Sequence, residues 1–283
     1  MADAHTSRDA ERQDRSRAPL IIVPGGDPMV VNNVVTSFNE AGYERYGRAF
    51  VESFLEFWPK NVRLTVYYEG EKFDFNEGMS WHPIEKVEYL VDYLGSLRFP
   101  IMHGIVGDNY EINFDARQAR KVFMEMHAMK TMRGKVFWID ADVVTHAKVP
   151  FGFLDDCLPD DKFCCYLGRD GWYYTESGFI GFNGDHPIAN KFYNNYVNTF
   201  VSGVNFTLPG WHDCYGFDAV RNILNQPWEF RNLAEGLPHG TMHPFVNSAL
   251  GRYMDHRKGQ RKESRSTDAD LVIARDEDYW KLQ

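Results

Sequence analysis

Two aspartates separated by one residue, Asp140 and Asp142, are the side chains of this 283-residue sequence best suited to chemistry. They follow the apolar run Val136-Phe-Trp-Ile139 and precede two valines. Carboxylates that leave a buried strand are costly unless they are paired. Mn²⁺ and Mg²⁺ prefer oxygen ligands and bridge protein carboxylates to phosphate oxygens. The pattern therefore predicts a site for Mn²⁺ or Mg²⁺. The alternative interpretation is that the two aspartates are ordinary solvated acids in a turn at the end of the strand.

The elements around the two aspartates place them at one edge of a sheet. Residues 135–139 are expected to form a short strand at the centre of a parallel sheet, because residues 136–139 are wholly apolar. Residues 115–131 carry one apolar stripe at helical spacing, with Asp115 as a candidate N-cap. In open α/β sheets, ligands bind outside the carboxyl ends of the strands. Asp140 and Asp142 therefore lie where a ligand site is expected.

The rest of the chain alternates predicted strands and helices. A strand over residues 33–37, a helix over 43–57 and a strand over 62–68 predict a βαβ unit with a parallel sheet. The segment beyond Pro238 is rich in Gly, His and basic residues, which indicates an active-site loop more than a packed element. We therefore predict one α/β domain over residues 19–283, with a Rossmann-like, mostly parallel central sheet flanked by helices. Further strands are predicted at 163–167 and 178–182, a further helix at 185–201, and a loop followed by a helix over 211–224.

Charge and composition narrow the classes of protein. The net charge of −9 disfavours binding to nucleic acid by charge alone, yet residues 252–265 carry six basic and two acidic side chains, which suits an anionic ligand. No apolar run approaches the ~20 residues that span a bilayer, and the N-terminus lacks the apolar core of a signal peptide. The four cysteines fit neither a disulfide framework nor a zinc site. A cytoplasmic protein is expected, with residues 1–18 as a polar, disordered tail.

Three segments, taken in order, resemble those of the GT-A glycosyltransferases. Val136-Phe-Trp-Ile-Asp140-Ala-Asp142 is similar to the DxD strand of that family. Glu176-Ser-Gly-Phe-Ile-Gly-Phe-Asn183 resembles the segment that lines the donor-sugar and acceptor region. His256-Arg-Lys258-Gly259-Gln-Arg-Lys262 resembles the His-x-x-Gly-x-Lys segment of glycogenin-like branches. The resemblance covers about residues 30–262 in motif order and implies a GT-A fold.

The resemblance also implies a division of roles among these residues. His256 would complete the metal shell begun by Asp140 and Asp142, and imidazole is an acceptable ligand for Mn²⁺. Lys258 or Lys262 would meet the diphosphate, whose charge basic side chains neutralise. The basic residues lie at positions +2, +5 and +6 from the histidine, which leaves the choice between them open. The implied activity is metal-dependent transfer of a sugar from a nucleotide diphosphate sugar, most simply a UDP-sugar, to an acceptor hydroxyl.

Other polar residues are candidates for donor contacts. Thr36, Ser37 and Asn39 follow the first strand, where GT-A enzymes contact the nucleoside, but a plain turn that caps a helix is equally compatible. Arg117 and Lys121 precede the DxD strand on a helix that, by resemblance, reaches the phosphate or sugar of the donor. A solvated helix face is equally compatible with these two basic residues.

The acceptor side leaves more alternatives open. Asp213, Glu176 and Asp218 are the candidate residues on this side, with Asp213 preferred as a base or sugar contact. An inverting enzyme needs a carboxylate base, whereas a retaining one does not need a base at that place. The acceptor can be a glycan, a protein, a small molecule or a modified DNA base of viral type. Aromatic side chains would support recognition of such a base. A sugar nucleotidyltransferase and a non-catalytic sugar- or nucleic-acid-binding module are the alternatives to a glycosyltransferase.

Overall fold

The computed structural model describes residues 32–70, 79–96, 112–169 and 174–281. The predicted tail over residues 1–18 lies outside the described residues, as do residues 19–31 at the start of the predicted domain. None of the described helices is long and apolar enough to cross a membrane.

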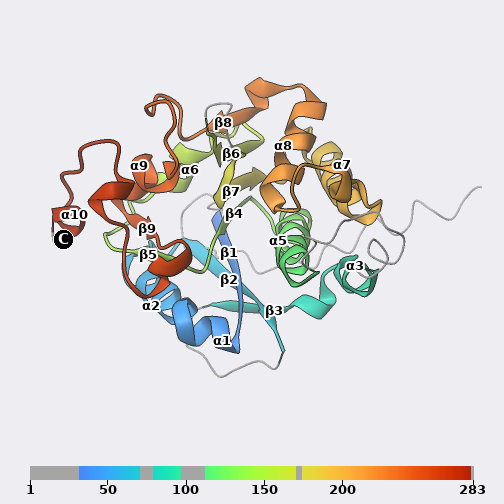
Figure 1. Ribbon diagram of the computed structural model, residues 1–283, viewed down its shortest axis with the longest axis horizontal. Helices are drawn as coiled ribbons and strands as arrows, with labels where there is room; N and C mark the ends of the chain where they lie inside the picture. The colour runs from blue at the N-terminus through green and yellow to red at the C-terminus, as the bar shows by residue number, and fades with distance from the viewer. Residues whose placement is uncertain (1–31, 71–78, 97–111, 170–173, 282–283) are drawn as a thin grey trace, which may run out of the picture. The chain divides into compact units, whose positions relative to one another are not determined.

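A seven-stranded sheet forms the centre of the described chain (Figure 1). Its strand order is β3-β2-β1-β4-β7-β6-β8, and β7 alone runs antiparallel to its two neighbours. The other neighbouring pairs are parallel. The strands are β1 (Asn32–Asn39), β2 (Val62–Glu69), β3 (Ser80–Pro83), β4 (Lys135–Ile139), β6 (Cys164–Leu167), β7 (Glu176–Asn183) and β8 (Phe230–Asn232). An α/β fold with a mostly parallel central sheet is therefore confirmed.

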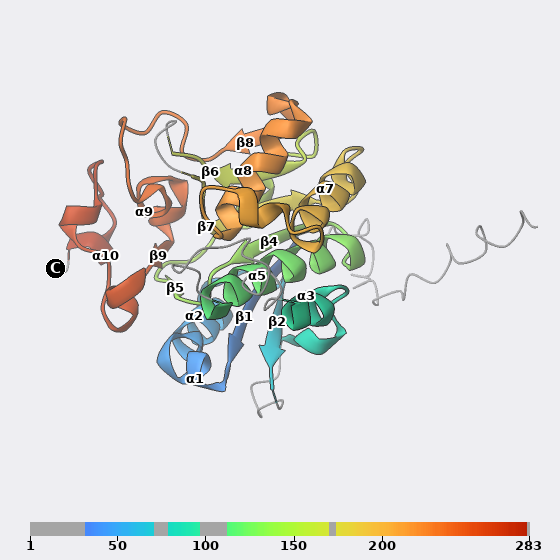
Figure 2. The ribbon, with the colours of Figure 1, turned by 45° about the vertical axis from the view of Figure 1, so that its right-hand side comes forward.

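Helices cover both faces of this sheet (Figures 1 and 2). On one face, α3 (Leu90–Ser96), α5 (Ile112–Thr131), α7 (Ala189–Val201) and α8 (Asp213–Leu224) share an apolar core with sheet residues such as Val136 and Ile180. On the other face, α2 (Arg48–Phe57) and α6 (Phe153–Cys157) pack against Phe137 and Ile139. Successive side chains of β4 point into opposite cores. Both faces of this strand are therefore buried, which explains why residues 136–139 are all apolar instead of alternating between apolar and polar.

Most of the predicted elements are confirmed, with shifts at their ends. The βαβ unit is present, and α2 is preceded by α1 (Glu40–Gly42) and a π-helical turn (Tyr43–Gly47). Helix α5 begins three residues before the predicted start, so Asp115 lies inside it and the N-cap prediction is wrong. Helix α7 begins at Ala189, after a turn that contains Pro187.

The segment after Pro238 is packed rather than loop-like, which corrects the sequence-based expectation. It contains α9 (Pro244–Asn247) and β9 (Met254–His256), whose neighbour in a separate two-stranded sheet is β5 (Val143–Thr145). The segment also contains apolar residues such as Phe245, which is fully buried in the core that α2 and α6 cover. The antiparallel pairing of β9 with β5 places His256 opposite Val143 and so brings it beside the two aspartates.

Candidate functional site

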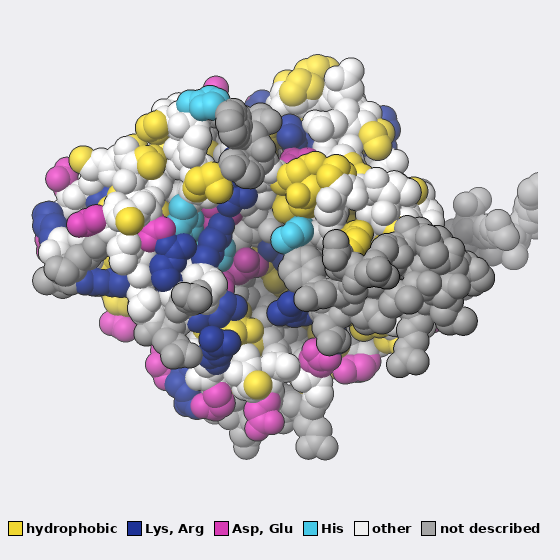
Figure 3. Space-filling view, in the orientation of Figure 1, with side chains coloured by type: hydrophobic (Ala, Val, Ile, Leu, Met, Phe, Trp, Pro, Cys, Tyr) yellow, Lys and Arg dark blue, Asp and Glu magenta, His cyan; other side chains and the backbone are white. Residues whose placement is uncertain are grey.

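A cavity of about 760 Å³ opens at the carboxyl ends of β1, β2 and β4 and at the start of the antiparallel strand β7. Figure 3 shows Lys and Arg side chains gathered beside a hollow on this face. Among the described residues, six basic and five acidic side chains line the cavity, although the whole chain carries a net charge of −9. They are Arg117, Arg120, Lys121, Arg169, Lys258 and Lys262 with Glu69, Asp140, Asp142, Glu176 and Asp213. The described lining of the cavity therefore carries one more basic than acidic side chain, whereas the chain as a whole is acidic.

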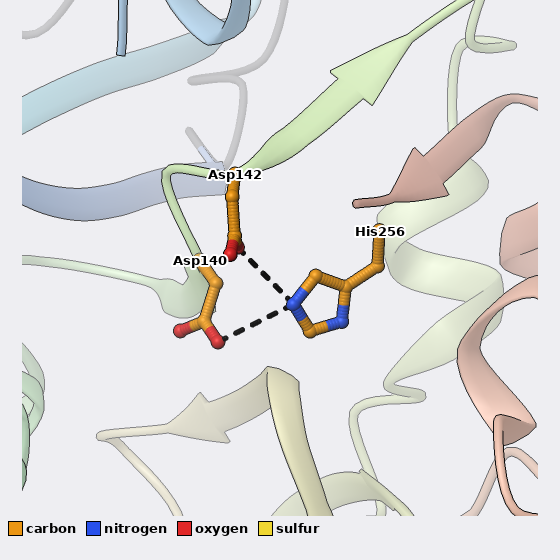
Figure 4. A group of neighbouring side chains, drawn as sticks. All are labelled: Asp140, Asp142 and His256. Atoms are coloured by element: carbon orange, nitrogen blue, oxygen red, sulfur yellow. Dashed lines mark ion pairs between the residues drawn. The ribbon is translucent and has the colours of Figure 1, made fainter. Parts of the chain in front are cut away.

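Asp140, Asp142 and His256 meet at one point of the cavity wall (Figure 4). The backbone turns directly after β4, where the Val143 amide donates to the Asp140 carbonyl at 3.0 Å. His256 Nε2 lies 3.2 Å from Asp142 Oδ1 and 3.6 Å from Asp140 Oδ2. One potential ligand atom from each of the three side chains lies within 4.8 Å of the other two. Two carboxylates and one imidazole are a donor set that fits Mn²⁺, so the residues present fit a divalent cation.

The charges around Asp142 show that this point already attracts cations. Burial alone would raise the pKa of Asp142, but His256 and Lys262 lower it well below its usual range. Lys262 Nζ lies 3.2 Å from Asp142 Oδ2 and 4.4 Å from the centre of the Tyr46 ring. Burial would lower the pKa of His256, but Asp142 raises it to about 9. The pocket thus stabilises positive charge next to two carboxylates.

Glu176, at the start of β7, lies behind His256 and is only 2 % exposed. Its Oε1 lies 2.6 Å from Lys258 Nζ and 2.9 Å from His256 Nδ1. Its Oε2 lies 3.1 Å from Arg169 and 3.4 Å from His243 Nδ1. Burial would raise the pKa of Glu176, but Lys258 and the two histidines hold it well below its usual range. Four basic side chains therefore surround one buried carboxylate.

Lys121 is buried on α5 and joins three parts of the site. Its ammonium lies 2.9 Å from Asp140 Oδ1, 3.2 Å from Asp213 Oδ2 and 2.5 Å from the Ser177 carbonyl. Burial would lower its pKa, but Asp140 and Asp213 raise it. The contacts to Asp140 and Ser177 are hydrogen bonds, whereas the contact to Asp213 is an ion pair. The solvated-face alternative for Lys121 is therefore wrong, because the helix turns this side chain into the site.

The structure brings all but two of the sequence-predicted residues, Thr36 and Asp218, to the cavity wall. Asp218 instead accepts hydrogen bonds from Thr175. Ser37 and Asn39 line it, and the Asn39 side chain also accepts a hydrogen bond from the Gly42 amide as the cap of α1. Arg117 is exposed and lines the cavity too. Thr36 does not line it, because the residue lies further from the end of β1 and is fully enclosed by the fold.

Several residues of the site were not predicted from the sequence, among them Tyr46, Arg169 and His243. Arg169 lines the cavity just beyond the carboxyl end of β6, a position that the strand-end rule could have singled out. His243 directly precedes α9, and its Nε2 donates to the His256 carbonyl at 3.1 Å. No local sequence signal points to His243, because only the packing of the chain after Pro238 brings it to Glu176.

No family model and no curated protein sequence matches the chain. Mouse xyloside xylosyltransferase 1, in its apo form, is similar in structure with a TM-score of 0.45 and 12 % identity, over 72 % of this chain and 85 % of that one. The apo structure of the bifunctional glycosyltransferase WbbM is similar with a TM-score of 0.47 and 15 % identity, over 88 % of this chain. This chain spans 50 % of the length of WbbM.

Proposed function

We propose that this protein is a divalent-metal-dependent glycosyltransferase. It moves a sugar from a nucleotide diphosphate sugar, most simply a UDP-sugar, to an acceptor hydroxyl. The observation that carries the proposal is the meeting of Asp140, Asp142 and His256 beside Lys258 and Lys262 in one cavity. A divalent cation between carboxylates and basic side chains is an arrangement that suits a diphosphate, because each of its phosphates carries negative charge.

The proposed diphosphate subsite lies between the cation ligands and the basic side chains from the segment after β9. Lys262 faces Asp142, and Lys258 faces Glu176, so both ammonium groups are already held at the cavity wall. When bound, the cation supplies Lewis-acid stabilisation of the departing nucleoside diphosphate. Lys258 and Lys262 add fixed positive charge where negative charge develops as the bond to the sugar breaks.

The proposed nucleoside subsite lies at the carboxyl end of β1. Ser37 and Asn39 offer hydrogen-bonding groups there, and Tyr46 offers an aromatic ring next to Lys262. An aromatic ring can stack on any nucleobase, and each such contact contributes about 1–3 kcal/mol to the binding free energy. A nucleoside at this end of the cavity would direct its diphosphate toward the cation ligands.

The proposed acceptor side lies at the first residue of α8, Asp213, which lines the cavity. Lys121 holds this carboxylate 3.2 Å from its ammonium and holds Asp140 at 2.9 Å. Asp213 is proposed to take the proton of the acceptor hydroxyl or to orient a sugar hydroxyl. Because Lys121 contacts both Asp213 and Asp140, it would keep the distance between the proposed acceptor side and the proposed metal site constant.

A panel of nucleotide sugars tests this function by thermal shift, with and without Mn²⁺, followed by an assay for slow donor hydrolysis. One donor is expected to raise the melting temperature by several degrees with Mn²⁺ only, since ligand at 100 times Kd adds about 2.7 kcal/mol. Asp142→Ala should abolish the shift, whereas the control Asp161→Asn, which removes an exposed partner of Lys162, should keep it. Equal binding without the metal would contradict the role of the aspartates.

Two further outcomes separate the alternative functions. Release of pyrophosphate from a nucleoside triphosphate and a sugar phosphate would indicate a nucleotidyltransferase instead. Donor binding with no hydrolysis and no transfer to glycan, peptide, small-molecule or DNA acceptors would indicate a binding module. Either result would overturn the proposed transfer reaction.

A further inference from the structure

We propose that Glu176 is a positioning residue, which holds His256 with its Nε2 toward Asp140 and Asp142 and holds Lys258 at the cavity wall. This inference rests on the proposed metal-binding function. It assigns Glu176 a different role from the general base that its residue type suggests.

The hydrogen bond at His256 Nδ1 decides which nitrogen faces the cation ligands. An ionised carboxylate accepts hydrogen bonds and donates none, so the 2.9 Å contact places a proton on Nδ1. In the neutral imidazole, the lone pair is then on Nε2, the nitrogen that lies nearest to Asp142. Metal-binding histidines are commonly oriented by a carboxylate on their other nitrogen, and loss of that partner costs 10–100-fold in metal affinity.

The strand that carries Glu176 also leaves room for the imidazole. Gly178 lies two residues further along β7, so it is on the same side of the strand as Glu176. A Cβ atom at position 178 would lie 2.4 Å from Cε1 and 2.5 Å from Nδ1 of the His256 ring. Strand β7 therefore supplies both the carboxylate that orients the ring and the gap that admits it.

The groups around Glu176 leave it poorly placed to act as a base. Its Oε1 is shared between His256 and Lys258, and its Oε2 faces Arg169 and His243. A base must reach the acceptor hydroxyl and take up its proton, but here both oxygens are already engaged by cationic or N–H groups. Arg169 and His243 are themselves tied to the backbone, through the Met242 and His256 carbonyls. The carboxylate is thus the centre of a rigid support.

The test compares Glu176→Gln with a matched control, Glu229→Gln. Glu229 lies 3.1 Å from His186 Nε2 and does not line the cavity, so the control removes a carboxylate from a histidine elsewhere. Titration of Mn²⁺ alone by calorimetry is expected to show 10–100-fold weaker binding in Glu176→Gln and no change in the control. Solvent exchange of the His256 Nδ1–H, measured by ¹⁵N NMR without metal, is expected to be slow in the wild type and faster in Glu176→Gln.

Neither measurement requires sugar transfer, so the inference and the proposed function can fail separately. Unchanged Mn²⁺ affinity in Glu176→Gln, together with loss of one limb of the pH–rate profile, would overturn the inference and indicate a base. If the wild type binds no Mn²⁺, the proposed metal function fails, and unchanged exchange at His256 would overturn the inference as well. If Glu176→Gln does not fold by circular dichroism, Glu176→Asp keeps the charge and is expected to weaken Mn²⁺ binding in the same direction.

Discussion

Lys121 Nζ lies 2.9 Å from Oδ1 of Asp140, so a cation on helix α5 directly contacts a proposed metal ligand at the end of strand β4. The same ammonium contacts Asp213, and Glu125 is fully buried one turn further along α5. Two carboxylates, Asp140 and Asp213, therefore share one ammonium as their counter-charge, whereas burial raises the pKa of Glu125 well above its usual range.

Replacement of Lys121 by Met is expected to destabilise the fold. Removal of one partner from a buried ion pair costs about 3–5 kcal/mol, because the remaining carboxylates lose their counter-charge. The control Lys130→Met, on the same helix, removes an exposed partner of Glu88 and should cost less than about 1 kcal/mol. Urea denaturation measures both free energies of unfolding, and equal effects would contradict the structural importance of Lys121.

A methyl group at position 178 is expected to displace the His256 ring, because a Cβ there lies 2.4 Å from it. Gly178→Ala should therefore weaken Mn²⁺ binding by about tenfold or more, in line with the loss of a ligand-orienting contact. The control Gly95→Ala adds the same methyl group at an exposed position of helix α3, where nothing lies within 4 Å of the added carbon. That change should leave Mn²⁺ binding unaltered and add about 0.5–1 kcal/mol of stability.

Removal of Lys262 is expected to weaken the binding of a nucleoside diphosphate. A charge-assisted hydrogen bond contributes about 1.5–3 kcal/mol, so Lys262→Met should raise the Kd of the diphosphate by about 10–100-fold. Lys281→Met, which removes an exposed partner of Asp278, serves as the control for loss of one positive charge. Calorimetry with the diphosphate in the presence of Mn²⁺ measures both, and equal effects would show that Lys262 acts through net charge alone.

The half-buried His127 is expected to make the fold acid-sensitive. Burial lowers the pKa of His127 to about 4, and its Nδ1 lies 2.8 Å from the Tyr67 hydroxyl. Because the folded-state pKa lies below the usual value near 6.5, the unfolded chain binds the proton first as pH falls. Stability is therefore fully present above about pH 6.5 and is lost progressively as pH falls toward 4.

The variant His127→Gln keeps a hydrogen-bonding side chain at this position and removes the titration. Its free energy of unfolding should vary less between pH 7 and pH 4.5 than that of the wild type. The control His239→Gln changes an exposed histidine outside the cavity. A wild-type pH dependence that both variants share unchanged would show that other groups carry the acid sensitivity.

Local pattern in the sequence was sufficient for the central elements. The apolar run of β4 followed by Asp140 and Asp142 specifies a buried strand that ends in two acids, because the signal depends only on neighbouring residues. The βαβ unit of β1, α2 and β2 follows from periodicity for the same reason. The order of the three family-like motifs also predicted that Asp142, His256 and Lys262 would share one site.

Contacts between distant residues were decided only by the tertiary structure. Glu176 and His256 are 80 positions apart, and their hydrogen bond exists because β9 pairs with β5 beside the start of β7. The burial of Lys121 and the enclosure of Thr36 depend in the same way on which face of a helix or strand the packing covers. Periodicity indicates that a face is buried, but the partners of a polar group on it are set by the packing of segments far apart in the chain. The sequence by itself therefore determined the sheet and the acidic pair, whereas the surroundings that make Glu176 a support rather than a base arise from long-range packing.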